Sequence, residues 1–372
     1  MGKSDIGVLV APPAAGKTVM GCALIAERNT STLVLVHRMP LLEQWRKQIA
    51  AFLGVDIRKI GTFSSTRKKP TYEIDVGMLP SFAKAEYPEA ILSRYGHIII
   101  DECHHIPAVS FEAVLKKIPA RYILGLTATP YRKDGHQSII HMQCGPIRHE
   151  LKDVDGPPLT KRVIIRETAF KMPDDAGPQP PIHLVWERLV ADPERMEVVA
   201  RDLRASIEAG RFPLVISERK EHLALLLRLF EERLKGLSAK GFVLIGSMGK
   251  KLRADMLGEI ESAPGAGIKP YVLATGSFIG EGYDLPSLDT LIIAMPVSFK
   301  GKLIQYAGRI HRANPGKTDA IIYDYLDSSS ALTVSMFRKR IAAYRKMNYQ
   351  IEAPSGSRAG RMSRVQGDFL FR

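Results

Sequence analysis

The sequence predicts an α/β protein with two tandem domains, each built around a doubly wound parallel sheet. Three observations lead to this class. The 372 residues are enough for two ordinary domains. The candidate strands are rich in Ile, Leu and Val without polar alternation, which is typical of strands buried on both faces of a parallel sheet. These strands alternate with helical stretches in two series of similar size.

The first series occupies residues 1–150. We expect one helix at residues 17–28 and another in PLLEQWRKQIAAFLG, where apolar residues recur every three or four positions and Gly54 ends the run. Strands are expected in IGVLVA (6–11), TLVLVH (32–37), EIDVGML (73–79), HIIIDE (97–102) and YILGLTAT (122–129).

Residues 151–182 change in character, because DVDGPPL and MPDDAGPQPP are rich in Pro, Gly and Asp around one strand, RVIIRE. We interpret this segment as the linker between the domains. The second domain, 183–330, is expected to contain a helix at 220–236 and strands in PLVIS, GFVLIG, PYVLAT, DTLIIAM and DAIIYDYL.

Residues 331–372 are interpreted as a basic C-terminal helix followed by a mobile tail. Residues 338–372 hold nine Lys and Arg against two acidic residues, Glu352 and Asp368, and residues 354–368 are rich in Gly, Ser and Arg.

Composition narrows the function classes. The net charge is +14, from 53 Lys and Arg against 39 Asp and Glu, which favours a polyanionic partner and nucleic acid first. No apolar run reaches the roughly 18 residues of a membrane span, so no membrane partner is expected. Cys22, Cys103 and Cys144 have no CxxC spacing, which argues against a zinc site or a disulfide framework and favours the cytoplasm.

APPAAGKT, residues 11–18, lies between the first strand and the first helix and is typical of a phosphate-binding loop. Gly16 lets backbone N–H groups approach phosphate, Lys17 supplies a cation, and the Thr18 hydroxyl suits Mg²⁺. The first position is Ala11 where the general pattern has Gly. The loop predicts a bound phosphate group with Mg²⁺, and Pro13, Ala14 and Ala15 are further candidate contacts.

HIIIDECHH, residues 97–105, predicts a strand that ends in two carboxylates at the sheet edge where such folds bind ligands. Asp101 is the candidate metal ligand together with Thr18, and Glu102 is the candidate that orients or deprotonates an attacking water. We expect hydrogen-bonding roles for His104 and His105, since no third metal ligand is near in sequence.

Two further motifs are typical of coupling between domains. LGLTATP places Thr127 and Thr129 after a strand, where their hydroxyls can bridge the nucleotide site to the second domain. In QYAGRIHR, the spacing of Gln305, Arg309 and Arg312 predicts one helix face that carries all three. An Arg from a second domain neutralises charge on a transferring γ-phosphoryl group.

The order APPAAGKT, LVHRMPLLEQW, DECHH, LTATPYRKDG, ATGSFIGEGYDLP and QYAGRIHR resembles superfamily-2 helicases, with most similarity to the XPB-type and restriction-translocase branches. TATPYRKDG together with MQCGPIRH also resembles the helicase parts of bacterial TOTE conflict-system proteins, which implies anti-phage defence. The resemblance covers about residues 6–326 and implies two RecA-like domains with the nucleotide site in the cleft between them.

The resemblance also implies roles for matching residues. Gly16, Lys17 and Thr18 would bind MgATP, and Gln305, Arg309 and Arg312 would contact the γ-phosphate from across the cleft. Gly282 and Asp284 would lie near the ribose. Nucleic-acid contacts would come from His37, Arg38, Met78, Ser81 and Thr275, and Pro80 stands where relatives often have Gln.

The sequence thus predicts an ATP-driven helicase or translocase that moves along a phosphate backbone, on DNA rather than RNA from the resemblance only. One alternative is a duplex translocase that does not separate strands and serves a nuclease or primase module carried elsewhere. The other is a nucleic-acid-binding scaffold with an inactive ATP site, against which Lys17, Asp101, Glu102 and Arg312 argue.

Only MGKSD precedes the first strand, whereas the related proteins carry an adenine-contacting segment there. We therefore expect the chain to be a fragment of a longer protein, with the adenine-stacking surface upstream. The expected consequence is weak discrimination among nucleotide bases, because the triphosphate contacts at Gly16, Lys17 and Thr18 are local.

Overall fold

The computed structural model describes residues 2, 4–12, 15–64, 68–84, 92–105, 119–128, 138–151, 159–173, 177, 180–279, 285–298, 300–312 and 314–364. The chain forms two compact units, Met1–Asp155 and Gly156–Arg372, and each has its own sheet. Within the described ranges, no helix has both the length and the apolar character needed to cross a membrane.

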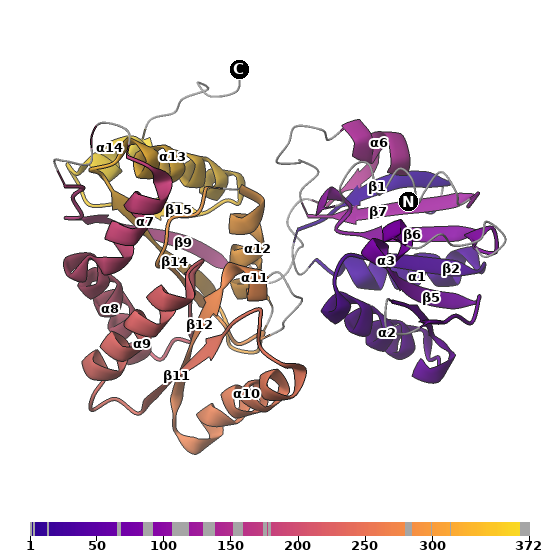
Figure 1. Ribbon diagram of the computed structural model, residues 1–372, viewed down its shortest axis with the longest axis horizontal. Coiled ribbons are helices and arrows are strands. Elements are labelled where there is room, and N and C mark those ends of the chain that lie inside the picture. Colours follow the sequence, from indigo (N-terminus) through magenta and orange to yellow (C-terminus); the bar gives the residue numbers. More distant parts are fainter. Residues whose placement is uncertain are drawn as a thin grey trace. The chain divides into compact units, whose positions relative to one another are not determined.

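Unit 1 is built on a sheet with the strand order β4-β3-β5-β2-β6-β7-β1-β8, and Figure 1 labels its central run β5, β2, β6, β7 and β1. Neighbouring strands are parallel except β3 and β4. The strands are β1 (Ile6–Val10), β2 (Thr32–Val36), β3 (Gly61–Phe63), β4 (Lys68–Lys69), β5 (Ile74–Met78), β6 (His97–Asp101), β7 (Tyr122–Thr127) and β8 (Ile147–Glu150). The five predicted strands are present, and the sheet also includes β3, β4 and β8, which are too short or too polar to be recognised from pattern.

Helices cover both faces of this sheet. The face covered by α1 (Lys17–Arg28) and α2 (Met39–Leu53) buries Trp45 and Ile49 against alternate strand residues, and the opposite face packs against α3 (Leu79–Lys84) and α6 (Ser138–Cys144). Two short 3-10 helices, η1 (Ile57–Lys59) and η2 (Cys103–His105), lie in loops. The helix α2 ends at Gly54 as predicted, in the left-handed conformation at φ 65° that glycine adopts without strain.

A buried histidine makes unit 1 sensitive to acid. His97 is fully buried in β6, and its Nε2 lies 2.6 Å from the Arg28 guanidinium. Burial, and then the Arg28 charge, lowers the pKa of His97 to about 3 from an ordinary value of 6.5. The unfolded chain therefore binds a proton that the folded chain excludes, so this stabilisation is complete above pH 6.5 and decreases as the pH falls toward 3.

We expect His97→Gln to flatten the pH dependence of unit 1 unfolding, because glutamine can still accept from Arg28 but does not titrate. Protonation of the unfolded histidine removes about 2 kcal/mol at pH 5 relative to neutral pH. Denaturant unfolding at pH 7 and pH 5 measures this loss in both proteins. His149→Gln, in the exposed strand β8, is the control. An equal loss in wild type and His97→Gln would contradict the assignment.

Unit 2 contains a parallel sheet with the order β11-β12-β10-β13-β14-β9-β15. Its strands are β9 (Thr160–Thr168), β10 (Pro213–Ser217), β11 (Ala239–Leu244), β12 (Lys269–Thr275), β13 (Thr290–Ile293), β14 (Asp319–Asp327) and β15 (Gln350–Glu352). The strand β9 lies within the segment interpreted as a linker, yet it pairs with β14 over nine residues. Its Val163 and Ile165 are fully buried, so this part of the segment belongs to the core of unit 2.

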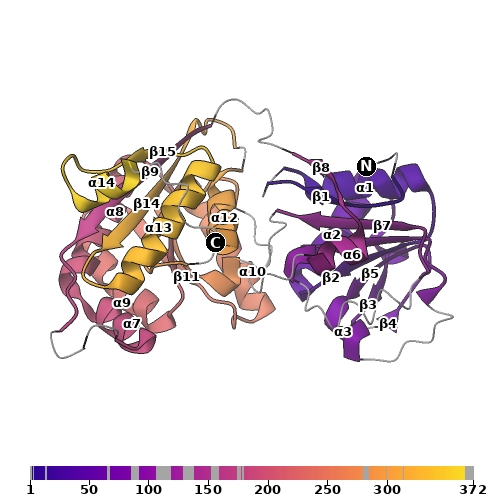
Figure 2. The same cartoon turned by 90° about the horizontal axis from the view of Figure 1, so that it is seen from above.

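The helices of unit 2 also cover both faces of the sheet (Figure 2). One face packs against α8 and α9, and the other against α10 to α14. The bounds are α7 (Ile182–Ala191), α8 (Pro193–Glu208), α9 (Lys220–Arg233), α10 (Lys250–Ser262), η4 (Ala263–Ala266), α11 (Gly276–Ile279), α12 (Lys300–Ile310), α13 (Ala331–Lys346) and α14 (Arg358–Arg364). Both units are thus parallel-sheet α/β domains, which confirms the predicted fold class.

The C-terminal residues are more integrated into unit 2 than the basic pattern indicates. Arg340 of α13 is 2% exposed and forms a bidentate ion pair with Asp324, with contacts of 2.7 and 2.9 Å. Residues 354–364 were expected in the mobile tail, but they include α14, whose Ala359 is buried in the core. Residues 365–372 lie outside the described residues.

Candidate nucleotide site and nucleic-acid interface

The predicted phosphate loop joins β1 to α1 at the carboxyl edge of the unit 1 sheet. The Ala11 N–H donates to the carbonyl of Thr127 at 2.9 Å, which ties the start of the loop to β7. Gly16 has φ 76° and ψ 28°, the left-handed region, and caps α1 at its N-terminus. The first turn of α1 has no acidic residue, so the helix N-terminus is electrostatically suited to an anion. Pro13 and Ala14 lie outside the described residues.

Lys17 folds back across this loop. Its ammonium donates to the carbonyl oxygens of Ala11 at 3.1 Å and Pro12 at 3.4 Å. Ala15, Gly16 and Thr18 are half-buried beside it. The ammonium therefore already lies within the loop, on carbonyl partners that a phosphate oxygen can replace as a stronger, charged acceptor.

Asp101 and Glu102 lie at the end of β6, as predicted. Asp101 is 8% exposed, and its Oδ1 accepts from the Glu102 N–H at 3.0 Å. Burial, followed by the neighbouring Glu102 charge, raises the pKa of Asp101 to about 6, while Lys17 acts to lower it. Because β1 and β6 are both parallel neighbours of β7, the phosphate loop and the acidic motif emerge at the same edge of the sheet.

Glu102 has a strained backbone and an unsatisfied carboxylate oxygen. Its φ of 49° lies in the left-handed region that residues with side chains rarely adopt. Its Oε2 is buried 3.3 Å from His104 Nδ1, without a hydrogen-bond partner in the described part of the chain. An unsatisfied buried oxygen beside a phosphate loop is suited to accept a proton or a hydrogen bond from water.

His104 connects the acidic motif to β7. Its Nδ1 shares a hydrogen bond of 2.7 Å with Thr127 Oγ1, and both groups are buried. The predicted hydrogen-bonding role of His104 therefore has a partner within unit 1. Thr129 lies outside the described residues, and the side chain of His105 is not described.

The donor set fits Mg²⁺. This ion prefers oxygen ligands and usually combines one or two carboxylates with waters and substrate phosphates. Asp101 supplies one buried carboxylate, and Thr18 supplies a hydroxyl in the first turn of α1. Among the described residues, no group of three His, Cys, Asp or Glu side chains that could hold a metal ion occurs. The metal would thus depend on the nucleotide phosphates for most of its coordination.

The three residues predicted to contact the γ-phosphate belong to unit 2. Gln305 and Arg309 lie on α12 and are half-buried, and the Arg309 Nη2 donates to the carbonyl of Ile279 at the end of α11. Arg312 follows two residues after α12 ends at Ile310. The prediction that one helix face carries all three is therefore wrong for Arg312, because the regular helix does not extend that far.

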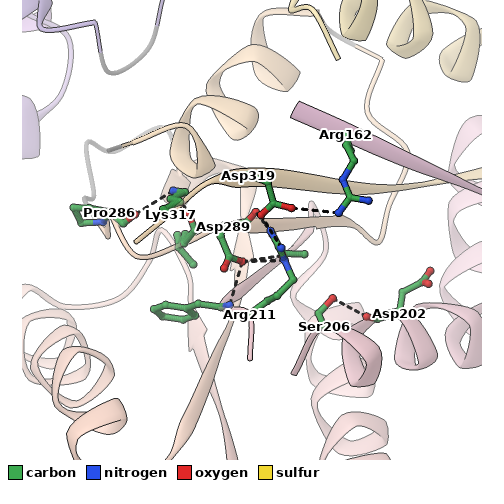
Figure 3. A network of polar contacts seen from close by, with 11 residues as sticks. Arg162, Asp202, Ser206, Arg211, Pro286, Asp289, Lys317 and Asp319 are labelled. Carbon is green, nitrogen blue, oxygen red and sulfur yellow. Dashed lines mark hydrogen bonds and ion pairs between the residues drawn. The ribbon is translucent and has the colours of Figure 1, made fainter. Parts of the chain in front are cut away.

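The turn that follows Arg312 is anchored by Lys317. Its ammonium donates to the carbonyl oxygens of Arg312 at 3.0 Å and Pro286 at 3.2 Å, and also to that of Leu288 (Figure 3). Burial lowers the pKa of Lys317 to about 8, although the nearby Asp289 carboxylate opposes this shift. The backbone at Arg312 is thus held to the segment that leads into β13.

The candidate nucleic-acid residues of unit 1 follow strands at the same sheet edge. His37 and Arg38 are half-buried between β2 and α2. Met78, at the end of β5, packs partly against the core, and Ser81 is half-buried in α3. Because β2 and β5 are parallel neighbours, these residues emerge from the same edge.

The unit 2 residues are less accessible or lie outside the described residues. Thr275 is 5% exposed, and its hydroxyl lies 3.1 Å from that of Ser277. A buried hydroxyl with an internal partner has little surface to offer a ligand. Gly282 and Asp284 lie outside the described residues.

Two residues near these motifs were missed from the sequence. Trp45 donates its indole N–H to Asp101 Oδ2 at 2.8 Å. Glu218, after β10, accepts from Lys302 at 2.7 Å and from the Tyr306 hydroxyl at 2.8 Å, which fixes α12. The only signal for Trp45 was its place on the apolar face of α2, which predicts a core residue.

Comparison with protein families gives one match in each unit. Residues 3–132 match the family described as Type III restriction enzyme, res subunit. Residues 195–314 match the family described as Helicase conserved C-terminal domain. Every candidate residue of the nucleotide site falls within these two ranges.

Two relatives extend this picture. A protein of Acanthamoeba polyphaga mimivirus, named as an ATP-dependent RNA helicase (L396), is 26% identical over 93% of this chain. The DNA 3'-5' helicase XPB of Mycobacterium tuberculosis is 35% identical over 40% of this chain. The chain spans 65% of the length of the mimivirus relative and matches 28% of the length of XPB.

A solved structure agrees with both units. The ATP-dependent Type ISP restriction-modification enzyme LlaBIII, bound to DNA, matches 96% of this chain and 30% of its own chain, with a TM-score of 0.64 at 16% identity. At this identity the match shows the fold, which is the RecA-like α/β fold of helicase domains. The family matches and the XPB relatives together support a superfamily-2 helicase or translocase of the XPB and restriction-enzyme type.

Proposed function

We propose that this protein is a nucleic-acid motor that couples hydrolysis of MgATP to movement along a phosphate backbone, on DNA in preference to RNA. The observation that carries the proposal is the convergence of Lys17, Asp101 and Glu102 at one sheet edge, with the Glu102 Oε2 buried and unsatisfied among the described residues. Backbone strain of the kind seen at Glu102, with φ 49°, clusters at functional sites, which favours an active ATP site over an inactive scaffold.

Binding begins at the loop. The triphosphate replaces the carbonyl partners of Lys17, and the N-terminus of α1 contributes its backbone N–H groups and dipole. Asp101 and Thr18 would hold Mg²⁺, which would supply neutralisation of phosphate charge when bound. Ala15 and Gly16 let the backbone approach the phosphates closely.

Glu102 then acts on water. Its Oε2 orients the attacking water and accepts its proton, while His104, which shares a hydrogen bond with Thr127, lies beside the carboxylate at 3.3 Å. The role follows from position, because Glu102 is the one carboxylate of this motif that Trp45 and the metal do not engage.

The second unit completes the reaction. We assign Arg309 and Arg312 to the developing charge on the γ-phosphoryl group and Gln305 to its oxygen atoms, with Gly282 and Asp284 near the ribose. ATP would draw the two units together through these contacts, and hydrolysis would release them. His37, Arg38, Met78 and Ser81 are the proposed contacts to the nucleic acid, whereas the buried hydroxyl of Thr275 is not among them.

Contacts to the phosphate backbone predict that nucleic-acid affinity depends on salt concentration. We expect the affinity for duplex DNA to fall steeply with salt, because each neutralised phosphate contributes a slope of about −0.9 in a plot of log K against log salt concentration. Arg38→Ala should make the slope shallower by about one such unit. Fluorescence anisotropy from 50 to 200 mM salt measures it.

The control is Arg58→Ala, because Arg58 is likewise an arginine of unit 1 but is exposed and pairs with Asp56 at 2.6 Å. Its slope should equal that of wild type. A flat salt response in wild type, or equal slopes in both variants, would contradict a backbone contact at Arg38.

DNA and RNA are separated by one assay. The printed names of relatives include both an RNA helicase and DNA helicases, so the preference for DNA depends on the XPB relatives. ATP hydrolysis stimulated by single-stranded DNA, duplex DNA and RNA at equal phosphate concentration tests it directly. Greater stimulation by RNA would contradict the proposed preference for DNA. A separate strand-displacement assay distinguishes a helicase from a duplex translocase.

A biological setting is proposed from the TATPYRKDG and MQCGPIRH resemblance. We place the motor in cytoplasmic anti-phage defence, together with a nuclease or primase module on a longer chain or a partner. The test is phage plating on cells that express the complete locus with and without Lys17→Ala. Equal plating efficiencies would reject this setting without affecting the ATPase assignment.

A further inference from the structure

Trp45 is buried between the helix that follows the phosphate loop and the Asp101 carboxylate, the proposed metal ligand. It lies on α2, is 1% exposed, and donates its Nε1–H to Asp101 Oδ2 at 2.8 Å. A Cβ atom at Gly21 of α1 would come within 2.7 Å of the Trp45 Cη2 and 3.3 Å of its Cζ3. Only glycine lets α1 approach the indole this closely, so the ring has little freedom to rotate.

The hydrogen bond from Trp45 orients the Asp101 carboxylate and leaves lone pairs on its oxygens that a metal ion can use. Oδ2 accepts from Trp45 and Oδ1 accepts from the Glu102 N–H, so both oxygens have one donor each and the carboxylate plane is set by two fixed groups. A carboxylate oxygen has two lone pairs, and the contacts of the described residues engage one on each oxygen. A metal-ligating carboxylate is commonly oriented by such outer hydrogen bonds.

The same residue joins this carboxylate to the proposed nucleic-acid contact. The helix α2 begins at Met39, directly after His37 and Arg38, and Trp45 lies six residues into it. At 1.5 Å per residue this is about 9 Å along one continuous helix. A shift of the helix N-terminus therefore moves the indole N–H that Asp101 accepts.

We infer that Trp45 is a positioning residue that orients the Asp101 carboxylate toward Mg²⁺ and ties this orientation to the position of α2. The inference deepens the proposed function and rests on it, because it assumes that Asp101 binds the metal of MgATP. Its chemistry is specific to an N–H donor, and a residue that only fills the core would not supply it.

The first test replaces the N–H while keeping an aromatic ring. In Trp45→Phe we expect the Mg²⁺ concentration for half-maximal binding of a fluorescent ATP analogue to rise by roughly tenfold, because a hydrogen bond to a charged group is lost. Binding of the analogue in EDTA should not change. Trp186→Phe, which alters the only other tryptophan, in α7 of unit 2, is the control and should behave as wild type.

The second test leaves Trp45 in place, so it does not depend on a variant in the core. In Trp186→Phe, Trp45 is the sole tryptophan and its fluorescence reports on the Asp101 contact. We expect MgATP to change its emission, ATP in EDTA to leave it unchanged, and the double variant Trp186→Phe, Asp101→Asn to lose the response. Duplex DNA without nucleotide should also change the emission, and Arg38→Ala should reduce that change.

The outcomes separate this inference from the proposed function. If the ATP analogue fails to bind wild type at all, the nucleotide site itself is wrong. If it binds, but Trp45→Phe weakens binding equally with Mg²⁺ and in EDTA, Trp45 is only a packing residue. If MgATP does not change the Trp45 emission, the proposal that Trp45 orients Asp101 toward Mg²⁺ is wrong. If duplex DNA does not change it, the proposed coupling through α2 is wrong.

Discussion

Replacing Glu102 with glutamine is expected to reduce ATP turnover by about 10²- to 10⁴-fold, the usual contribution of a positioned general base. Glutamine keeps the size of the side chain but cannot accept the proton. The backbone should keep its φ of 49°, because the two side chains have the same shape at this position. The phosphate contacts come from Lys17 and the loop, so ATP affinity should stay within about threefold.

Single-turnover hydrolysis and equilibrium nucleotide binding measure the two quantities separately. Glu73→Gln, an exposed glutamate just before β5, is the matched control and should hydrolyse ATP at the wild-type rate. Near-normal nucleic-acid-stimulated hydrolysis in Glu102→Gln would remove the assigned role. A variant that loses binding as strongly as turnover would place Glu102 in nucleotide binding instead of water activation.

Replacing Arg312 with alanine is expected to slow hydrolysis by about 10³-fold or more, as for other arginine fingers, with little loss of ATP affinity. The reason is that the guanidinium meets charge that develops on the γ-phosphoryl group in the transition state, whereas unit 1 makes most of the ground-state contacts. Lysine should rescue little, because it lacks the planar fork of donors.

The distinction between Arg312 and Arg309 can be tested in the same assay. Arg309 already donates to the carbonyl of Ile279, so Arg309→Ala also disturbs the junction between α11 and α12 and should lower thermal stability. Arg312→Ala should not. Arg228→Ala, an exposed arginine of α9, is the control for a general loss of positive charge. A mild effect at Arg312 with a large kinetic effect at Arg309 would exchange their roles.

The fold class was predictable because its signals are local or periodic. Strands such as β2 and β6 are buried along their whole length, so continuous apolar runs identify them. The linker assignment was less accurate, since β9 is flanked by Pro- and Gly-rich sequence but pairs with β14. Composition reports only on residues that are close together in the chain. The pairing of β9 with β14 joins residues about 160 positions apart, so the composition of the segment could not predict it.

The sequence by itself determined which residues stand at the strand ends of unit 1. Open parallel sheets bind ligands outside the carboxyl ends of their strands, so Lys17, Asp101 and Glu102 could be placed at one edge from strand–loop–helix order alone. The folded structure decided the contacts between these motifs. The bonds from Trp45 to Asp101 and between His104 and Thr127 join residues 56 and 23 positions apart. Such bonds depend on how α2 and the strands pack. The spacing of apolar residues predicts which face of a helix is buried, but it does not predict which acceptor a buried donor such as the Trp45 indole N–H will contact.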